Sequence, residues 1–181
     1  RQNTQDARKM AVNVEIKAHA RDVERLHALA AELANRAPEV VEQTDTFFCV
    51  PSGRLKLREL GPDRGELIHY HRRDQTGPAR SAYSIVQTNE PAALRDCLAA
   101  ALGVRGVVRK KRWIYHVGQT RIHVDDVSDL GSFLEVEVVL SPEQSVEDGR
   151  QIFLRLKDDL DIRDEDLIQG AYIDLLEQTA V

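Results

Sequence analysis

Length and composition place the chain among ordinary globular proteins of one domain. Its 181 residues are 42% hydrophobic and 30% charged, values that disfavour intrinsic disorder. No apolar run approaches the ~20 residues of a membrane helix, and residues 1–10 lack the apolar centre of a secretory signal. We therefore expect a cytoplasmic protein with no membrane partner, and the net charge of −5 argues against non-specific binding of nucleic acid.

The first half of the chain mixes strands with one helix. Residues 12–19 alternate strictly between apolar and polar side chains, which predicts a strand. Asp22 is placed to cap a helix that ends before Pro38. A second strand is expected over 46–50, and the turn at 51–53 leads into a hairpin. The strands of this hairpin are predicted at 54–58 and 66–73.

The second half continues the mixture and predicts an α+β protein. Pro91 begins and Gly103 ends a predicted helix, and Gly118 lies in a tight hairpin turn where a positive φ is expected. Ser145 is placed to cap another helix. The remaining predictions are strands over 81–88, 107–117, 120–127 and 133–140 and a short last helix within 165–176.

The polar faces of these strands are unusually rich in charge. Basic and acidic side chains alternate with apolar ones, so that each strand presents one charged and one apolar face. The charged faces carry Glu15, Lys17, Arg54, Lys56, Arg58, Lys110, Arg112, Arg121, His123, Asp125, Glu135 and Glu137.

This alternation has two interpretations, which it supports about equally. In the first, the apolar faces pack under helices while the charged faces enclose the interior of a barrel of about eight strands. In the second, the charged faces are solvated and are held by weak cross-strand ion pairs.

A cation-lined interior has a definite chemical consequence. Facing cations repel one another, so a highly anionic ligand and carboxylates are needed to compensate them, and triphosphate is the natural ligand. Glu135 and Glu137 are two residues apart on one strand and can share Mg²⁺ or Mn²⁺, with Glu15 completing the set. Lysines and arginines would neutralise the remaining phosphate charge.

Four segments of the sequence resemble one family in content and order. They are Asn-Val-Glu-Ile-Lys at 13–17, Gly-Arg-Leu-Lys-Leu-Arg at 53–58, Gly-Gln-Thr-Arg-Ile-His-Val-Asp at 118–125 and Leu-Gly-Ser-Phe-Leu-Glu-Val-Glu at 130–137. The family is the CYTH domain, or triphosphate tunnel metalloenzymes, which includes class IV adenylyl cyclases, thiamine triphosphatases and inorganic triphosphatases.

The resemblance implies a fold and a ligand. It implies an antiparallel eight-stranded β-barrel, the triphosphate tunnel, with helices packed on the outside. Residues 11–178 would form a single CYTH domain preceded by an N-terminal extension, residues 1–10. The ligand would be ATP, thiamine triphosphate or tripolyphosphate, bound with Mg²⁺ or Mn²⁺, and self-association as a homodimer stays open.

The resemblance also implies roles for individual residues. Lys17, Arg121 and Asp125 would take part in catalysis. Glu15, Glu135 and Glu137 would hold the metal. The triphosphate would be bound by Lys17, Lys56, Arg58, Arg72, Lys110, Arg112 and Arg121.

One position departs from the family pattern. Asn13 replaces the first Glu of the family's Glu-x-Glu-x-Lys signature, and a neutral ligand there would weaken metal binding. A Tyr in the family's C-terminal segment matches Tyr172, for which core packing is the favoured role.

The motif wording is closest to class IV adenylyl cyclases, which convert ATP to cyclic AMP and pyrophosphate. Hydrolysis of the terminal phosphate of tripolyphosphate or thiamine triphosphate is the first alternative. Non-catalytic binding of triphosphate or polyphosphate, motivated by Asn13, is the second.

Overall fold

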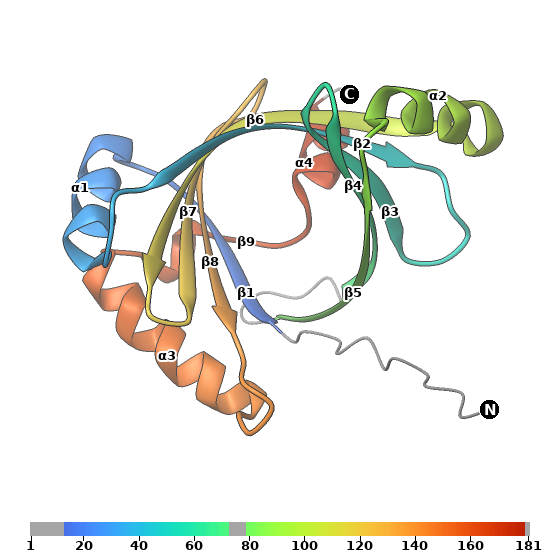
Figure 1. The fold of residues 1–181 in the computed structure, drawn as a ribbon. Coiled ribbons are helices and arrows are strands. Elements are labelled where there is room, and N and C mark those ends of the chain that lie inside the picture. Colours follow the sequence, from blue (N-terminus) through green and yellow to red (C-terminus); the bar gives the residue numbers. More distant parts are fainter. Residues whose placement is uncertain (1–12, 73–78, 180–181) are drawn as a thin grey trace, which may run out of the picture.

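The computed structural model of the protein describes residues 13–72 and 79–179, so the predicted N-terminal extension lies outside the described residues. Nine strands and four helices make up the fold of this part of the chain (Figure 1). In chain order the elements are β1 Asn13–His19, α1 Val23–Leu33, β2 Glu39–Phe48, β3 Arg54–Gly61, β4 Arg64–Arg72, β5 Ala79–Thr88, α2 Pro91–Leu102, β6 Val104–Val117, β7 Thr120–Val127, β8 Gly131–Val139, α3 Val146–Asp159, the 3₁₀ turn Asp164–Asp166, β9 Leu167–Ile168 and α4 Tyr172–Thr179.

The strands form one antiparallel sheet in the order β5-β4-β3-β2-β6-β7-β8-β1-β9. A further pairing connects β5, the first strand in this order, to β1, the eighth. It runs from Asn13 opposite Ser81 to Glu15 opposite Ala79 and closes the sheet. Eight strands therefore surround a lumen, as the resemblance predicts. The ninth strand, β9, adds two residues beside Lys17 and Ala18 of β1.

The sorting of charged and apolar faces explains why this sheet curves around a polar lumen. The outward residues of β1, β7 and β8, such as Ile16, Ile122 and Val136, are at most 3% exposed and form one core with α1 and α3. Burial of these apolar side chains is the main source of stability for such an arrangement. The inward residues of the same strands are charged, so the first interpretation of the alternation is the correct one.

The four helices do not all lie on the same side of the sheet. Figure 1 shows α1, α2 and α3 on the convex side and α4 on the concave side. Ala171, Tyr172 and Ile173 pack with Phe47 of β2 and Val108 of β6, two inward-facing residues. The helix α4 therefore closes one end of the lumen.

Local signals in the sequence determine where several elements begin and turn. The Asp22 side chain accepts a hydrogen bond from the backbone N–H of Arg25 at 3.0 Å, and Ser145 and Asp148 form a capping box. Gly118 has a φ of 55° in the β6–β7 turn, as expected. None of the described helices combines the length and the apolar character needed to cross a membrane.

Most predicted strand ends differ from the structure by a few residues, and two predicted elements differ more strongly. The strand expected at 46–50 spans Glu39–Phe48 instead, because residues 42–46 are polar on both faces and carry no apolar signal. The helix expected within 165–176 is instead a 3₁₀ turn, the short strand β9 and α4. Gly170, at a φ of 85°, separates these elements, because a left-handed residue interrupts a helix.

Candidate functional site

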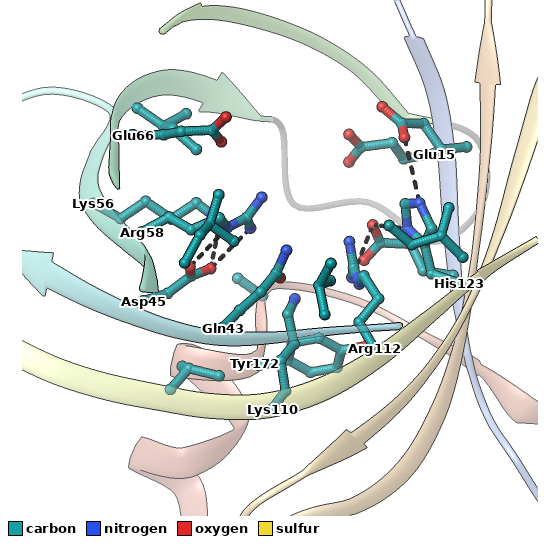
Figure 2. Close-up of a pocket in the computed structure, with 18 of the residues that line it drawn as sticks. Glu15, Gln43, Asp45, Lys56, Arg58, Glu66, Lys110, Arg112, His123 and Tyr172 are labelled. Carbon is teal, nitrogen blue, oxygen red and sulfur yellow. Dashed lines mark hydrogen bonds and ion pairs between the residues drawn. The ribbon is translucent and has the colours of Figure 1, made fainter. Parts of the chain in front are cut away.

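The lumen contains a cavity of about 470 Å³ whose wall comes from strands β1 to β8 and from the start of α4 (Figure 2). This volume falls within the roughly 300–1,000 Å³ typical of small-molecule sites. The lining basic residues among those described are Lys17, Lys56, Arg58, Arg64, Lys110, Arg112 and Arg121. The lining carboxylates among those described are Glu15, Glu39, Asp45, Glu66, Glu135 and Glu137.

One group of charges is centred on Asp45 of β2. Its carboxylate accepts hydrogen bonds from Lys56 Nζ at 2.8 Å and from Arg58 Nε and Nη2 at 2.8 and 3.0 Å, all drawn in Figure 2. Burial by itself would raise the pKa of Asp45, but Arg58 and Lys56 outweigh burial and hold this pKa well below its ordinary value. The carboxylate is therefore ionised and fixes both cations in the wall.

A second group lies on the neighbouring strands β6, β7 and β8. Arg112 donates two hydrogen bonds of 2.7 Å to Asp125, and its Nη2 is 3.4 Å from Glu135 Oε1. Glu135 also accepts from Lys17 Nζ at 2.6 Å and lies 3.3 Å from His123 Nδ1. Burial would raise the pKa of Glu135, but Lys17 and Arg112 hold it well below its ordinary value.

Lys110 lies between these two groups and is only 7% exposed. Burial, and then the neighbouring charge of Arg112, lower the pKa of Lys110 to about 7, although Asp125 and Asp45 act in the opposite direction. The unfolded chain holds the Lys110 proton up to its ordinary pKa near 10. Between these two values the unfolded state binds more protons than the folded state.

This difference predicts that stability rises with pH above 7. The single Lys110 proton contributes a slope of at most about 1.4 kcal/mol per pH unit to the free energy of unfolding. Chemical denaturation at pH 7, 8 and 9 should show that the free energy of unfolding rises with pH in the wild type and rises less in Lys110→Met. The exposed neighbour Lys111 provides the control, since Lys111→Met should keep the wild-type slope; equal slopes in all three proteins would contradict the prediction.

Further along β1 and β8, the same wall presents oxygen atoms suited to a hard cation. Glu15 and Glu137 are directly opposite each other on β1 and β8, and both line the lumen. Glu137 accepts two hydrogen bonds from Arg121 and one from the amide of Asn13. The Asn13 Oδ1 atom is buried without a hydrogen-bond partner in the described structure, although buried acceptors are nearly always satisfied. Two carboxylates and this free amide oxygen fit a divalent cation.

The predicted metal set is only partly supported by this arrangement. Within residues 13–72 and 79–179, no three His, Cys, Asp or Glu side chains form a ready metal cluster. Glu135 is already engaged by Lys17, Arg112 and His123. Glu137 is likewise engaged, by Arg121 and Asn13, so a cation held by Glu15 and Glu137 would replace part of these contacts.

Most of the predicted site residues meet in the lumen, with two exceptions. Asp125 is fully buried behind Arg112 and is not part of the cavity wall. Arg72 ends β4, but its side chain lies outside the described residues. The catalytic roles given to Lys17, Arg121 and Asp125 stay predictions.

Sequence reasoning missed two lining residues of β2. Asp45 organises Lys56 and Arg58, and Gln43 points into the cavity with a buried Oε1 that has no partner in the described structure. Both residues precede the stretch 46–50 on which the strand prediction depends. Residues 42–46 are all polar, so no alternation of apolar and polar side chains shows which face Gln43 and Asp45 share.

Several aliphatic residues line the cavity towards the end away from α4. Along four strands an aliphatic residue follows the polar lining residues in that direction. These residues are Val41 of β2, Leu60 of β3, Ile85 of β5 and Ile114 of β6. The mouth of the lumen therefore combines these aliphatic residues with the charged residues Glu39 and Arg64, whereas most of the paired cations and carboxylates lie further in.

A closed antiparallel sheet around a lumen of buried cations and carboxylates defines the class of triphosphate tunnel folds. The CYTH domain family model matches residues 11–172. The chain belongs to the CYTH domain family. No curated protein matches the sequence.

Solved structures with the same fold cover nearly the whole chain. A protein from Pyrococcus horikoshii is 24% identical with a TM-score of 0.79, over 90% of this chain and 98% of that one. A candidate adenylate cyclase from Vibrio parahaemolyticus is 18% identical with a TM-score of 0.77, over 93% and 99%. A candidate adenylyl cyclase from Hippeastrum, described as having a dominant triphosphatase activity, is 12% identical with a TM-score of 0.62, over 84% and 89%.

Proposed function

We propose that this protein is a metal-dependent enzyme that binds an organic triphosphate in its lumen, with ATP converted to cyclic AMP and pyrophosphate as its reaction. The observation that carries the proposal is that paired cations line the inner part of the lumen while four aliphatic residues lie towards its mouth. The cations suit the phosphates, and Val41, Leu60, Ile85 and Ile114 offer apolar contacts to an organic group such as a nucleoside. Tripolyphosphate would leave these four residues without a partner.

The charge balance of the described wall supports metal dependence. Seven lysines and arginines face six carboxylates among the described lining residues, so this part of the wall carries almost no excess positive charge. A triphosphate carries several negative charges, which metal ions and basic residues neutralise together in phosphoryl transfer. When bound by Glu15, Glu137 and Asn13, Mg²⁺ or Mn²⁺ would supply the missing positive charge.

The reaction would depend on positioning and on electrostatic stabilisation. The ribose 3′-oxygen would form a bond to the α-phosphorus, while the bond from that phosphorus to the bridging oxygen breaks. Pyrophosphate would then leave, and the hydroxyl proton would pass to solvent. Lys17 and Arg121 would stabilise the charge on the phosphate oxygens, whereas Asp125 would act only by orienting Arg112.

The direct test is product analysis with three substrates. Purified protein is incubated with Mg²⁺ or Mn²⁺ and with ATP, thiamine triphosphate or tripolyphosphate, and the products are separated. Cyclic AMP with pyrophosphate is expected from ATP. Lys56→Met should reduce turnover roughly 100-fold, as loss of one charge-stabilising donor does, while Asp45 keeps its contacts to Arg58 and the fold stays intact.

Lys157 on α3 provides a matched control, because it pairs with Asp164 and does not line the lumen. Lys157→Met should keep wild-type turnover. Turnover unchanged in Lys56→Met would place the chemistry elsewhere and contradict the proposal.

Hydrolysis of the terminal phosphate is the second candidate reaction. The triphosphatase activity described for the Hippeastrum protein motivates it, and the same charged wall would serve a water molecule as nucleophile. Inorganic phosphate without cyclic AMP would favour this reaction. Tight binding of all three compounds without products would instead favour a triphosphate-binding protein.

A further inference from the structure

Tyr172 is the first residue of α4 and occupies the closed end of the lumen. Its side chain is 5% exposed and forms part of the cavity wall. It also packs on Phe133, with ring centroids 5.0 Å apart. Packing with Phe47, Val108 and Phe133 therefore accounts for part of its surroundings, and charged residues provide further contacts.

The ring of Tyr172 lies close to two ammonium groups that come from separate parts of the barrel. Lys17 Nζ is 4.3 Å and Lys110 Nζ is 5.0 Å from the ring centroid. The two lysines belong to β1 and β6, which are not neighbours in the sheet. Attraction between a cation and an aromatic ring is strongest where water is excluded, and both lysines are at most 7% exposed.

The hydroxyl of Tyr172 reaches a third cation through a carboxylate. It donates a hydrogen bond of 2.8 Å to Asp125 Oδ2, the oxygen that also accepts from Arg112 Nη2 at 2.7 Å. Lys110 Nζ is 3.7 Å from the same oxygen. Tyr172 thus shares one carboxylate with two of the lumen cations.

The position of Tyr172 is fixed by the way α4 is attached to the barrel. Asp174 pairs with Arg54 of β3 and with Arg105 of β6, each at 2.8 Å, and accepts from the Ala171 backbone N–H at 2.8 Å. Next to Tyr172, Ile173 packs against Gly106 so closely that a Cβ at this glycine would clash with the Cδ1 atom of Ile173. The ring therefore has little freedom to move away from the lysines.

We infer that Tyr172 is a positioning residue of the lumen. Its ring holds the ammonium groups of Lys17 and Lys110 together at the closed end, and its hydroxyl orients Arg112 through Asp125. Three cations then meet one end of the ligand at fixed positions. The identity of the ligand as a triphosphate rests on the proposed function, whereas the positioning itself does not.

The positioning can be measured without any ligand. Lysine side-chain protons near an aromatic ring carry an upfield ring-current shift in NMR spectra. The Hε signals of Lys17 and Lys110, assigned with Lys→Arg variants, should be shifted in the wild type and in Tyr172→Phe, which keeps the ring. They should lose the shift in Tyr172→Leu, and unchanged signals in that variant would overturn the inference.

Binding of tripolyphosphate with Mg²⁺, measured by calorimetry, supplies the functional readout. Tyr172→Leu should bind about tenfold more weakly, as expected for loss of ring contacts to two desolvated lysines, and Tyr172→Phe should lose less. Equal affinity of Tyr172→Leu and the wild type would overturn the inference. A wild type that binds no triphosphate would contradict the proposed function alone, because the ring-current result stands independently.

Tyr115 offers a matched control outside the lumen. It is 4% exposed, faces the core under α1 and bonds to His27 at 2.7 Å. Tyr115→Leu removes a comparable buried ring and should leave both lysine signals unchanged. If Tyr172→Leu does not fold, Tyr172→Phe still tests the hydroxyl: the Arg112 Nε–H signal should move in that variant, and an unmoved signal would overturn the role assigned to the hydroxyl.

Discussion

Arg112→Met is expected to lower the free energy of unfolding by about 3–5 kcal/mol, the cost of leaving a buried charge without its partner. Arg112 is 5% exposed and Asp125 fully buried, and the two share two hydrogen bonds of 2.7 Å. The variant would also remove one of the two cations near Glu135. Chemical denaturation at pH 7 measures the loss.

The control for this prediction is Arg121→Met. Arg121 also makes two hydrogen bonds to a carboxylate, Glu137, but its side chain is 40% exposed, and exposed pairs contribute about 0–1 kcal/mol. Both variants should weaken triphosphate binding, whereas only Arg112→Met should destabilise the fold strongly. Equal losses of stability would show that burial does not determine the effect.

The pH dependence of the Arg112→Met effect has a definite sign. Despite burial, Arg112 and its basic neighbours hold the pKa values of Asp125 and Glu135 below their ordinary values. The stability that these carboxylates contribute is therefore present above about pH 4 and is lost as the pH falls further. The difference between wild type and variant should be larger at pH 7 than at pH 3.5.

Asn13→Asp is expected to make stability depend on a divalent cation. The new carboxylate would face Glu15 and Glu137 in a position that is 1% exposed, and like charges repel strongly where water is excluded. A bound cation would relieve this repulsion and gain a charged ligand. Because the number of charged ligands tunes cation affinity, Mn²⁺ should bind about tenfold or more tightly than in the wild type.

Thermal denaturation and calorimetry measure both effects. In the presence of a chelator the melting temperature of Asn13→Asp should fall below that of the wild type, and Mn²⁺ should reverse the difference. Asn35→Asp is the matched control, because Asn35 is exposed and lies beyond the end of α1. Its melting temperature should respond neither to the chelator nor to Mn²⁺. A melting temperature of Asn13→Asp that is insensitive to Mn²⁺ would rule out a cation at this wall.

Alternation predicted most of the strands that line the tunnel, because a period of two residues shows which side chains share a face. It did not reveal residues 39–45 of β2. It also predicted that Lys17, Lys56, Arg58, Lys110 and Arg112 share one surface, which the structure confirms. It left open whether that surface faces water or a lumen. Curvature and closure of a sheet depend on pairing between distant strands such as β1 and β5, which a local pattern does not contain.

The parts that could not be predicted involve residues whose partners are far apart in the chain. Asp45 is unremarkable in sequence, and its importance comes from Lys56 and Arg58 across a strand pair. Tyr172 meets Lys17 from the opposite end of the chain. Asp125 shares the spacing of the lining residues but is covered by Arg112 and by α4, because the helix closes the lumen at that level.

The pairing of cations with carboxylates in the lumen makes ligand binding an exchange of partners. Asp45 and Glu135 already occupy the positions around Lys56, Arg58 and Lys17 that phosphate oxygens would share. The net affinity is then a difference between two sets of charged contacts, and selectivity comes from geometry more than from attraction. A monovalent anion, which replaces too few of these contacts, would be a poor competitor at physiological concentrations, whereas a chain of linked phosphates replaces several at once.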